Sequence, residues 1–424
     1  MQLCPLCFLV ASSIVFASAV GCGTDSSKSA TDMSALEGDE SHVDAANDSV
    51  SQCQQSAARC ESSTAIWCDS GEEQRQECAP AGYCNFGECE ESAFTLPDDA
   101  APHADVIEWW YYTGHLTTGE REFGFEISLF QQRMEDLMGT TPPEGEEFGF
   151  MCHVALLDKD NKEHFYTQGI STKPRTWSSQ PVVLDTMNCT LELSGDGHDH
   201  IVGVIPEGEE GKGLPGSWAF DLWVDAEKPV VHHGTDGVIP MAQGGDSYYY
   251  SFTRMTASGT VTTPDGSEDV TGQAWMDHQW GNFQTMDFKG WDWWSMQFDD
   301  GWEIMLFLFR DWDDVIVVKS GSVVDPEGNV HHLDGAGAFE VTSLREWSSE
   351  ETDGVYPLDW NISIGELDWN LEVRTRFDAQ EVPNFAKNYW EGAVEIAGTR
   401  GETSVGGVGY VELTGYATDI MAPQ

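Results

Sequence analysis

The sequence predicts an all-β protein built from antiparallel sheets and preceded by a small disulfide-rich module. Short runs rich in aromatic and β-branched residues recur between Ile107 and Tyr416, separated by Gly, Asp, Asn and Pro. No long amphipathic helical pattern interrupts them, since only residues 131–137 show a weak one. Many short strands with this spacing are typical of β-barrels or β-sandwiches.

An internal repeat predicts that this architecture occurs twice. Residues 124–130 match residues 301–307 in register, and an acidic residue followed by two tryptophans precedes each copy, at 108–110 and 292–294. A turn that leads to a histidine follows each copy. Matching features in the same order predict two copies of one β unit, with a boundary near residues 282–289. Chance similarity between aromatic strands is the alternative.

The first 22 residues are predicted to be an export signal. An apolar run extends from Leu3 to Val20, contains small residues towards its end and is followed by Cys22. Residues 19–22 (Ala-Val-Gly-Cys) resemble a bacterial lipobox, in which the cysteine becomes lipidated. We therefore expect an exported protein that is either a cell-envelope lipoprotein, touching the membrane only through a lipid on Cys22, or freely secreted. An uncleaved anchor is disfavoured because the run is short.

A tether and a cysteine module are predicted to follow the signal. Residues 23–51 are rich in Ser, Asp, Ala and Glu and almost lack large apolar residues, as solvated tethers do. Residues 52–91 are polar and have too few apolar side chains for a core, so disulfides are expected to hold them together. They contain Cys53, Cys60, Cys68, Cys78, Cys84 and Cys89. Several connectivities are possible, and no C-x-x-C pair suggests zinc. Cys152 and Cys189 are predicted to pair if their strands adjoin.

Charge and motif content exclude several classes of function. The chain has 73 acidic against 20 basic residues and a formal net charge of −53. Such a surface repels phosphate backbones, so no nucleic-acid partner is expected. No G-x-S-x-G elbow or Gly-Lys phosphate loop occurs, which argues against a serine hydrolase of the α/β kind and against nucleotide use. The histidine-rich loops lack further ligands at suitable spacing, so we expect no metal and no organic cofactor.

The stretch 270–281 (V-T-G-Q-A-W-M-D-H-Q-W-G) carries the candidate chemistry. If it is a strand, Trp275 and Asp277 point to one face and His278 to the other. A carboxylate surrounded by indole rings loses hydration, which raises its pKa and lets it hold a proton near neutral pH. Asp277 is therefore a candidate general acid. The structural alternative is that it caps a turn or pairs with an arginine.

Seven stretches between about residues 95 and 417 together resemble one family. They are Glu108–Gly114, Met151–Asp158, Ser247–Ser251, Ala274–Gly281, Trp291–Trp294, Tyr389–Gly392 and Gly409–Tyr416. They resemble the AttH and CrtC superfamily, which includes carotenoid 1,2-hydratases and the fungal hydratase of kievitone. The resemblance implies two side-by-side lipocalin-like antiparallel β-barrels, which we place at residues 95–284 and 285–424.

The resemblance also implies a reaction. In the carotenoid hydratases the catalytic acid lies in an aromatic-x-Asp arrangement, which Trp275-Met276-Asp277 resembles. Those enzymes protonate a terminal alkene, and water then captures the cation without a metal or an organic cofactor. A His-x-Trp arrangement of those hydratases is replaced here within residues 247–250, which leaves the substrate open. Fungal relatives catalyse pericyclic ring closures, so the fold alone does not fix the reaction.

The predicted site is centred on Asp277 as the acid. Tyr248 and Tyr250 share a strand face and are predicted to bind the water or a substrate oxygen. Substrate-binding roles are predicted for Trp109, Trp110, Trp275, Trp280, His278, Glu108 and His153, the tryptophans facing a developing cation. The leading hypothesis is a cofactor-free hydro-lyase acting on a lipophilic, alkene-containing small molecule. A non-catalytic carrier of such a ligand is the main alternative, and an isomerase or cyclase is the third.

Overall fold

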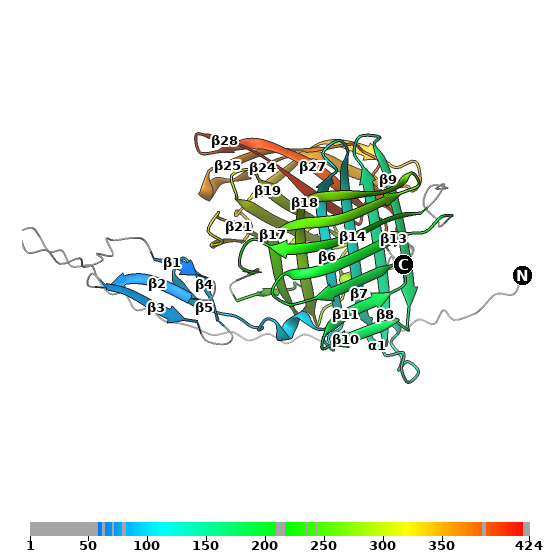
Figure 1. Ribbon diagram of the computed structural model, residues 1–424, viewed down its shortest axis with the longest axis horizontal. Coiled ribbons are helices and arrows are strands. Elements are labelled where there is room, and N and C mark those ends of the chain that lie inside the picture. The colour runs from blue at the N-terminus through cyan, green and yellow to red at the C-terminus, as the bar shows by residue number, and fades with distance from the viewer. Residues whose placement is uncertain are drawn as a thin grey trace, which may run out of the picture. The chain divides into compact units, whose positions relative to one another are not determined.

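The computed structural model describes residues 58–418, except 62–63, 70–71, 79–81, 209–216, 235, 243 and 384–386. The predicted signal and tether, the lipidation site Cys22 and Cys53 lie outside the described residues. The chain is almost entirely β, which confirms the predicted fold class (Figure 1). Within the described part, none of the helices has the length and apolar content that crossing a membrane requires.

The first large sheet runs from cyan to green in Figure 1 and curls into a half-barrel. Its strand order is β10-β11-β12-β13-β14-β17-β18-β6-β7-β8-β9, and β15 and β16 also pair with β17. The 3-10 helix η1 (Asp98–Ala100) precedes it, and α1 (Met134–Met138) follows β7. The strands are β6 (Ile107–Thr117), β7 (Glu122–Arg133), β8 (Phe148–Asp158), β9 (Glu163–Ser171), β10 (Thr176–Ser179), β11 (Val182–Thr186), β12 (Cys189–Leu193), β13 (His198–Ile205), β14 (Trp218–Ala226), β15 (Val231–His232), β16 (Val238–Pro240), β17 (Asp246–Thr263) and β18 (Gly266–Gly281).

The second large sheet, yellow to red in Figure 1, is also a curled antiparallel half-barrel. Its strand order is β22-β21-β20-β19-β28-β27-β25-β24-β23, with β26 paired to β27. The 3-10 helix η2 (Thr285–Asp287) precedes it, and η3 (Gly365–Leu367) follows β24. The strands are β19 (Gly290–Phe298), β20 (Glu303–Arg310), β21 (Ile316–Val324), β22 (Val330–Asp334), β23 (Glu340–Ser348), β24 (Val355–Ile364), β25 (Trp369–Thr375), β26 (Glu381–Val382), β27 (Tyr389–Arg400) and β28 (Thr403–Thr414).

The strand register shows the internal repeat. Trp109 of β6 pairs with Phe130 of β7, and Trp293 of β19 pairs with Phe307 of β20. These are the positions that the sequence repeat aligns. The spatial order β17-β18-β6-β7-β8-β9 of the first sheet is repeated as β27-β28-β19-β20-β21-β22 in the second. Each half-barrel therefore contains one copy of the same β unit.

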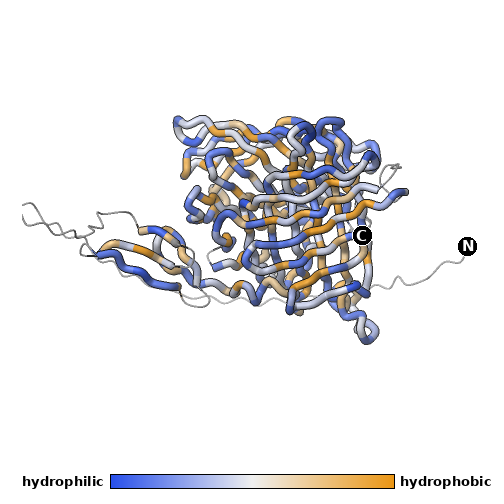
Figure 2. Tube along the Cα trace, in the orientation of Figure 1, coloured by the Kyte–Doolittle hydropathy of each residue, from blue (hydrophilic) through white to orange (hydrophobic). Residues whose placement is uncertain are grey.

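Each half-barrel has its own apolar core, and a third apolar layer joins the two sheets. Trp110 belongs to the first core and Trp294 to the second. The third layer combines Tyr111 and Tyr249 of the first sheet with Trp293 of the second. Side chains alternate along a strand, so neighbouring residues such as 110 and 111 serve different layers. Figure 2 shows how apolar and polar residues are distributed along the strands.

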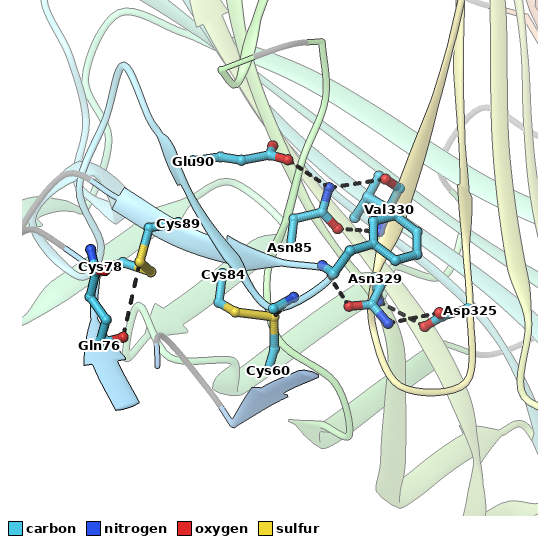
Figure 3. The surroundings of a disulfide bond; sticks show 12 residues. Cys60, Gln76, Cys78, Cys84, Asn85, Cys89, Glu90, Asp325, Asn329 and Val330 are labelled. Carbon is cyan, nitrogen blue, oxygen red and sulfur yellow. Dashed lines mark hydrogen bonds between the residues drawn. A yellow bond between two sulfur atoms is a disulfide. The ribbon is translucent and has the colours of Figure 1, made fainter. Parts of the chain in front are cut away.

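The cysteine module contacts the second sheet through an asparagine. The Asn85 amide donates to the Val330 carbonyl (3.1 Å) and accepts from the Val330 N–H (2.8 Å), as a neighbouring strand would (Figure 3). The Phe86 N–H donates to Oδ1 of Asn329 (2.9 Å). Disulfides join Cys60 to Cys84 and Cys78 to Cys89, and Cys68 is also disulfide-bonded. The module strands are β1 (Arg59–Glu61), β2 (Thr64–Asp69), β3 (Glu72–Glu77), β4 (Gly82–Asn85) and β5 (Glu88–Glu91).

Cys152 of β8 and Cys189 of β12 form the predicted disulfide inside the first core. The two cysteines are 37 residues apart, so the bond restricts a long loop of the unfolded chain. We expect the Cys152→Ala/Cys189→Ala protein to lose about 4 kcal/mol of unfolding free energy in urea titrations. A loss below about 1 kcal/mol would show that the loop is already restricted in the unfolded state.

Candidate functional site

A cavity of about 290 Å³ lies where the two sheets face one another. Its wall is mainly aromatic and apolar, with a few polar groups, as is usual for small-molecule sites. The first sheet supplies Ile107, Trp109, Phe130 and Met151, and the second supplies Trp291, Trp293, Phe307 and Phe309. The polar groups in the wall include Asp277, Tyr249, His153, Tyr389 and Glu412. Each half-barrel therefore contributes one wall, and the cavity lies outside both barrel cores.

Asp277 lies in this wall with its carboxyl held by three donors. The Tyr249 hydroxyl donates to Oδ2 (2.6 Å), and the Trp275 Nε1–H donates to Oδ1 (2.6 Å). The Ser251 hydroxyl also donates to Oδ1. The side chain is buried. None of the ion pairs between described residues involves Asp277, so the structural alternative of an arginine partner does not apply.

Burial raises the pKa of Asp277 to about 6, although the hydrogen bonds from Ser251, Tyr249 and Trp275 oppose the rise. Burial disfavours the ionised form because the carboxylate loses its hydration. The three donors stabilise that same form, which keeps the pKa from rising further. The carboxyl is therefore protonated below about pH 6 and ionised above it.

Further hydrogen bonds, from Trp293 of the second sheet and from His233 next to β15 of the first, orient these donors. Trp293 donates its Nε1–H to the Tyr249 hydroxyl oxygen (3.1 Å). Ser251 uses its own proton for Asp277, so it accepts from Nε2 of His233 (2.7 Å). Nδ1 of His233 then accepts from the hydroxyl of Ser322 (2.9 Å). Burial lowers the pKa of His233 well below its usual value, which keeps the ring neutral.

The tyrosine at Asp277 is Tyr249, and the predicted Tyr248 and Tyr250 lie on the other face of β17. Ser251 of β17 pairs directly with Asp277 of β18. Tyr249 pairs with Gln279, which lies on the same face of β18 as Asp277. A β-bulge between Phe252 and Met255 shifts the register by one residue. Such a shift turns every following side chain to the opposite face. Tyr248 and Tyr250, which were predicted to bind the water or a substrate oxygen, therefore do not lie beside Asp277.

Several other predicted residues gather in the first core, away from the cavity. Nε2 of His278 lies 2.8 Å from Oε1 of Glu108, and Nδ1 of His103 lies 2.7 Å from the same oxygen. The Tyr250 hydroxyl contacts Nδ1 of His278 (3.1 Å), and Trp110 stacks on that ring. Burial opposes ionisation of Glu108, but the hydrogen bonds from His103 and His278 hold its pKa below the usual value. The residues of this cluster that were predicted as site residues are Glu108, Trp110, Tyr248, Tyr250, His278 and Trp280.

The same cluster has the spacing of a possible metal site. His103, Glu108 and His278 each offer one ligand atom, and these atoms lie within 4.8 Å of one another. In the structure both histidines are hydrogen-bonded to Glu108. Of the residues predicted to bind substrate, Trp109 and His153 line the cavity, and Trp275 reaches Asp277 through its indole N–H.

Three glutamates at the interface were missed by the sequence analysis. Glu412 lines the cavity and lies directly opposite Glu391 on the neighbouring strand. Glu391 accepts a hydrogen bond from Tyr111 of the first sheet (2.7 Å), and Ser128 donates to Glu126. Burial raises the pKa of Glu412 to about 7 and that of Glu126 to about 8, and it raises that of Glu391 well above the usual value. The sequence signal that could have identified these glutamates is an acidic residue within an otherwise apolar strand.

Comparisons with known proteins agree with the motifs in the sequence. A family model described as AttH-like matches residues 88–416. The structure of a Nitrosomonas europaea protein assigned as AttH is similar at 26% identity and a TM-score of 0.65, covering 77% of this chain and 98% of that one. Kievitone hydratase from Nectria haematococca is similar at 17% identity and a TM-score of 0.55, covering 76% and 92% respectively. Among curated proteins, none matches this chain by sequence.

Proposed function

The chain belongs to the AttH-like family, and from this membership and the Asp277 site we propose that it is a cofactor-free hydro-lyase that adds water to an alkene of a lipophilic small molecule. The observation that carries the proposal is the Asp277 carboxyl. It is buried in the wall of an apolar cavity, it has a raised pKa, and it has no cationic partner among the described residues. A proton on such a group is available to a substrate that is itself weakly basic.

Tyr249 delivers the proton in this proposal. The Tyr249 hydroxyl donates to the Asp277 carboxylate, but once Asp277 is protonated the direction of this bond reverses. Asp277 then donates to the Tyr249 oxygen, and the Tyr249 O–H turns into the cavity that its side chain lines. The alkene takes the Tyr249 proton at one carbon while Asp277 reprotonates Tyr249, which leaves a carbocation and the Asp277 carboxylate. Water then bonds to the cationic carbon and loses a proton, which returns to Asp277 by the same route. The sum is alkene plus water giving an alcohol.

The aromatic wall supports the cationic intermediate of this reaction. Trp109 comes from the first sheet, and Trp291 and Trp293 come from the second. The faces of indole rings attract a cation, most strongly where water is excluded. Ionised Asp277 adds a negative charge in a low-dielectric site, where its effect is larger than in water.

The comparisons support the fold, but they give weaker support for the reaction. The name of kievitone hydratase describes a hydration, but its 17% identity establishes only a shared architecture. We also propose that the protein acts after export, either freely secreted or as an envelope lipoprotein. Disulfide bonds, which this chain contains, persist in oxidising compartments.

A test that needs no known substrate uses the intact protein and a lipid extract. The extract is incubated in ¹⁸O-labelled water, and mass spectrometry searches for compounds that gain one labelled water. We expect at least one such product to form with the protein and none without it. A ligand that is bound but recovered unchanged would favour the carrier, and a product of unchanged mass would favour an isomerase or cyclase.

A further inference from the structure

Among the described residues, two carboxyl groups lie in the cavity wall, one from each half-barrel. Asp277 lies on β18 of the first sheet, and Glu412 lies on β28 of the second. Glu412 is half-buried because it opens onto the cavity, whereas Asp277 is almost completely enclosed by its donors. A ligand in the cavity therefore meets Glu412 more directly than Asp277.

Two further glutamates lie close to Glu412. Glu391 of β27 is its neighbour across the strand pair, and Glu126 of β7 interacts electrostatically with both glutamates. Burial and the nearby Asp277 raise the pKa of Glu412, while the hydrogen bond from Trp291 and the charge of Lys387 lower it. These carboxyl groups disfavour one another's ionisation, so a further negative charge among them is costly.

Lys387 is the one lysine or arginine among the described residues that lines the cavity. Its ammonium group donates to the main-chain carbonyls of Lys289 (2.9 Å) and Phe288 (3.3 Å). It also lies 5.3 Å from the centre of the Trp291 ring. These contacts hold the ammonium group beside the main chain between η2 and β19, and its charge also acts on Glu412.

We propose that the cavity accepts uncharged alkenes and rejects their carboxylate analogues, and that Glu412 determines this selectivity. The proposal takes its ligand class from the proposed hydration, but it concerns binding and is measured without turnover. A neutral hydroxyl can donate to an ionised carboxyl or accept from a protonated one. A carboxylate ligand cannot donate, and beside an ionised Glu412 it brings two negative charges together in an apolar site, so one of the two groups must take up a proton or the ligand stays out.

Farnesol and farnesoate test this selectivity because they differ only at the head group. Binding to the full chain is followed at pH 8 by quenching of tryptophan fluorescence, since several tryptophans line the cavity. We expect farnesol to bind at least about tenfold more tightly than farnesoate. In Glu412→Gln, which keeps the side-chain shape and removes the charge, the ratio is expected to fall at least about threefold. Glu346→Gln, at an exposed position on β23, serves as the control and keeps the ratio.

Each outcome decides the proposal. Equal or tighter binding of farnesoate, or no binding of either probe, would overturn the selectivity. An unchanged ratio in Glu412→Gln, with a melting temperature close to that of the parent protein, would remove Glu412 from the explanation. If the labelled-water experiment gave no product while farnesol still bound more tightly than farnesoate, only the proposed reaction would be contradicted. The two proposals therefore fail separately.

Discussion

Asp277→Asn is expected to lower kcat/KM for hydration about 10³-fold, the middle of the range for a lost general acid. An amide accepts the hydrogen bonds from Trp275 and Ser251 but has no acidic proton to supply through Tyr249. The measurement compares the rates at which the variant and the parent protein form the product found in the labelled-water experiment. Ligand binding should change little, because the amide keeps the shape of the carboxyl.

A matched control for this variant is Asp199→Asn. Asp199 is also buried, and its carboxyl also accepts a hydrogen bond from a tyrosine, Tyr112 (2.9 Å), but it lies in the first sheet away from the cavity wall. We expect its turnover to match the parent protein within about twofold. Equal activity of Asp277→Asn and the parent protein would remove Asp277 from the mechanism.

The Asp277→Asn variant should not lose stability at pH 7. Burial raises the folded-state pKa of Asp277 to about 6, so ionisation opposes folding as the pH rises from about 4 to about 6. Above that window the folded protein carries this cost in full. Asparagine removes it, so a melting temperature equal to or above that of the parent is expected at pH 7, together with loss of activity. Lost activity with a much lower melting temperature would indicate a structural role instead.

Tyr249→Phe is expected to lower kcat/KM about 10²-fold, because the proton from Asp277 no longer has a hydroxyl to pass through. Loss of this hydrogen bond also removes a group that stabilises the carboxylate. The pKa of Asp277 should therefore rise, and the fall of activity with increasing pH should move to higher pH. Turnover measured between pH 5 and 9 separates this effect from a loss of folding.

Tyr248→Phe is the control, since it changes a neighbouring tyrosine on the opposite face of β17. It should leave both kcat/KM and the pH profile unchanged. If Tyr248→Phe lost activity and Tyr249→Phe kept it, the register of the two strands around the bulge would have to be reassigned.

The sequence was sufficient for the fold class and the duplication, and the role of Asp277 as the acid stays a prediction. Alternation along 270–281 placed Asp277 beside Trp275, and the aligned repeats gave hairpins with the same register. The structure places Tyr249, and neither Tyr248 nor Tyr250, beside Asp277. An unbroken β17–β18 hairpin would place Tyr248 and Tyr250 on the face of Asp277. The bulge at residues 253–254 reverses this, and no residue in that segment marks it in advance.

The position of the cavity depends on packing between distant segments. Alternation shows that Trp109 and Trp110 face opposite sides of β6, but both sides are apolar, so the pattern does not say which one meets the other half-barrel. For the same reason Glu108 was predicted to bind substrate, although it forms a hydrogen-bonded cluster with His278 inside the first core. Glu412 approaches Asp277 only once the two sheets pack together.

The most direct test is a ¹³C NMR titration of the Asp277 carboxyl in the full chain, with its signal assigned by its absence from Asp277→Asn. We predict a pKa of about 6 and a fall in hydration activity with the same midpoint as the pH rises. A pKa close to the ordinary value of about 4 would contradict this, because the group would then hold almost no proton at pH 6.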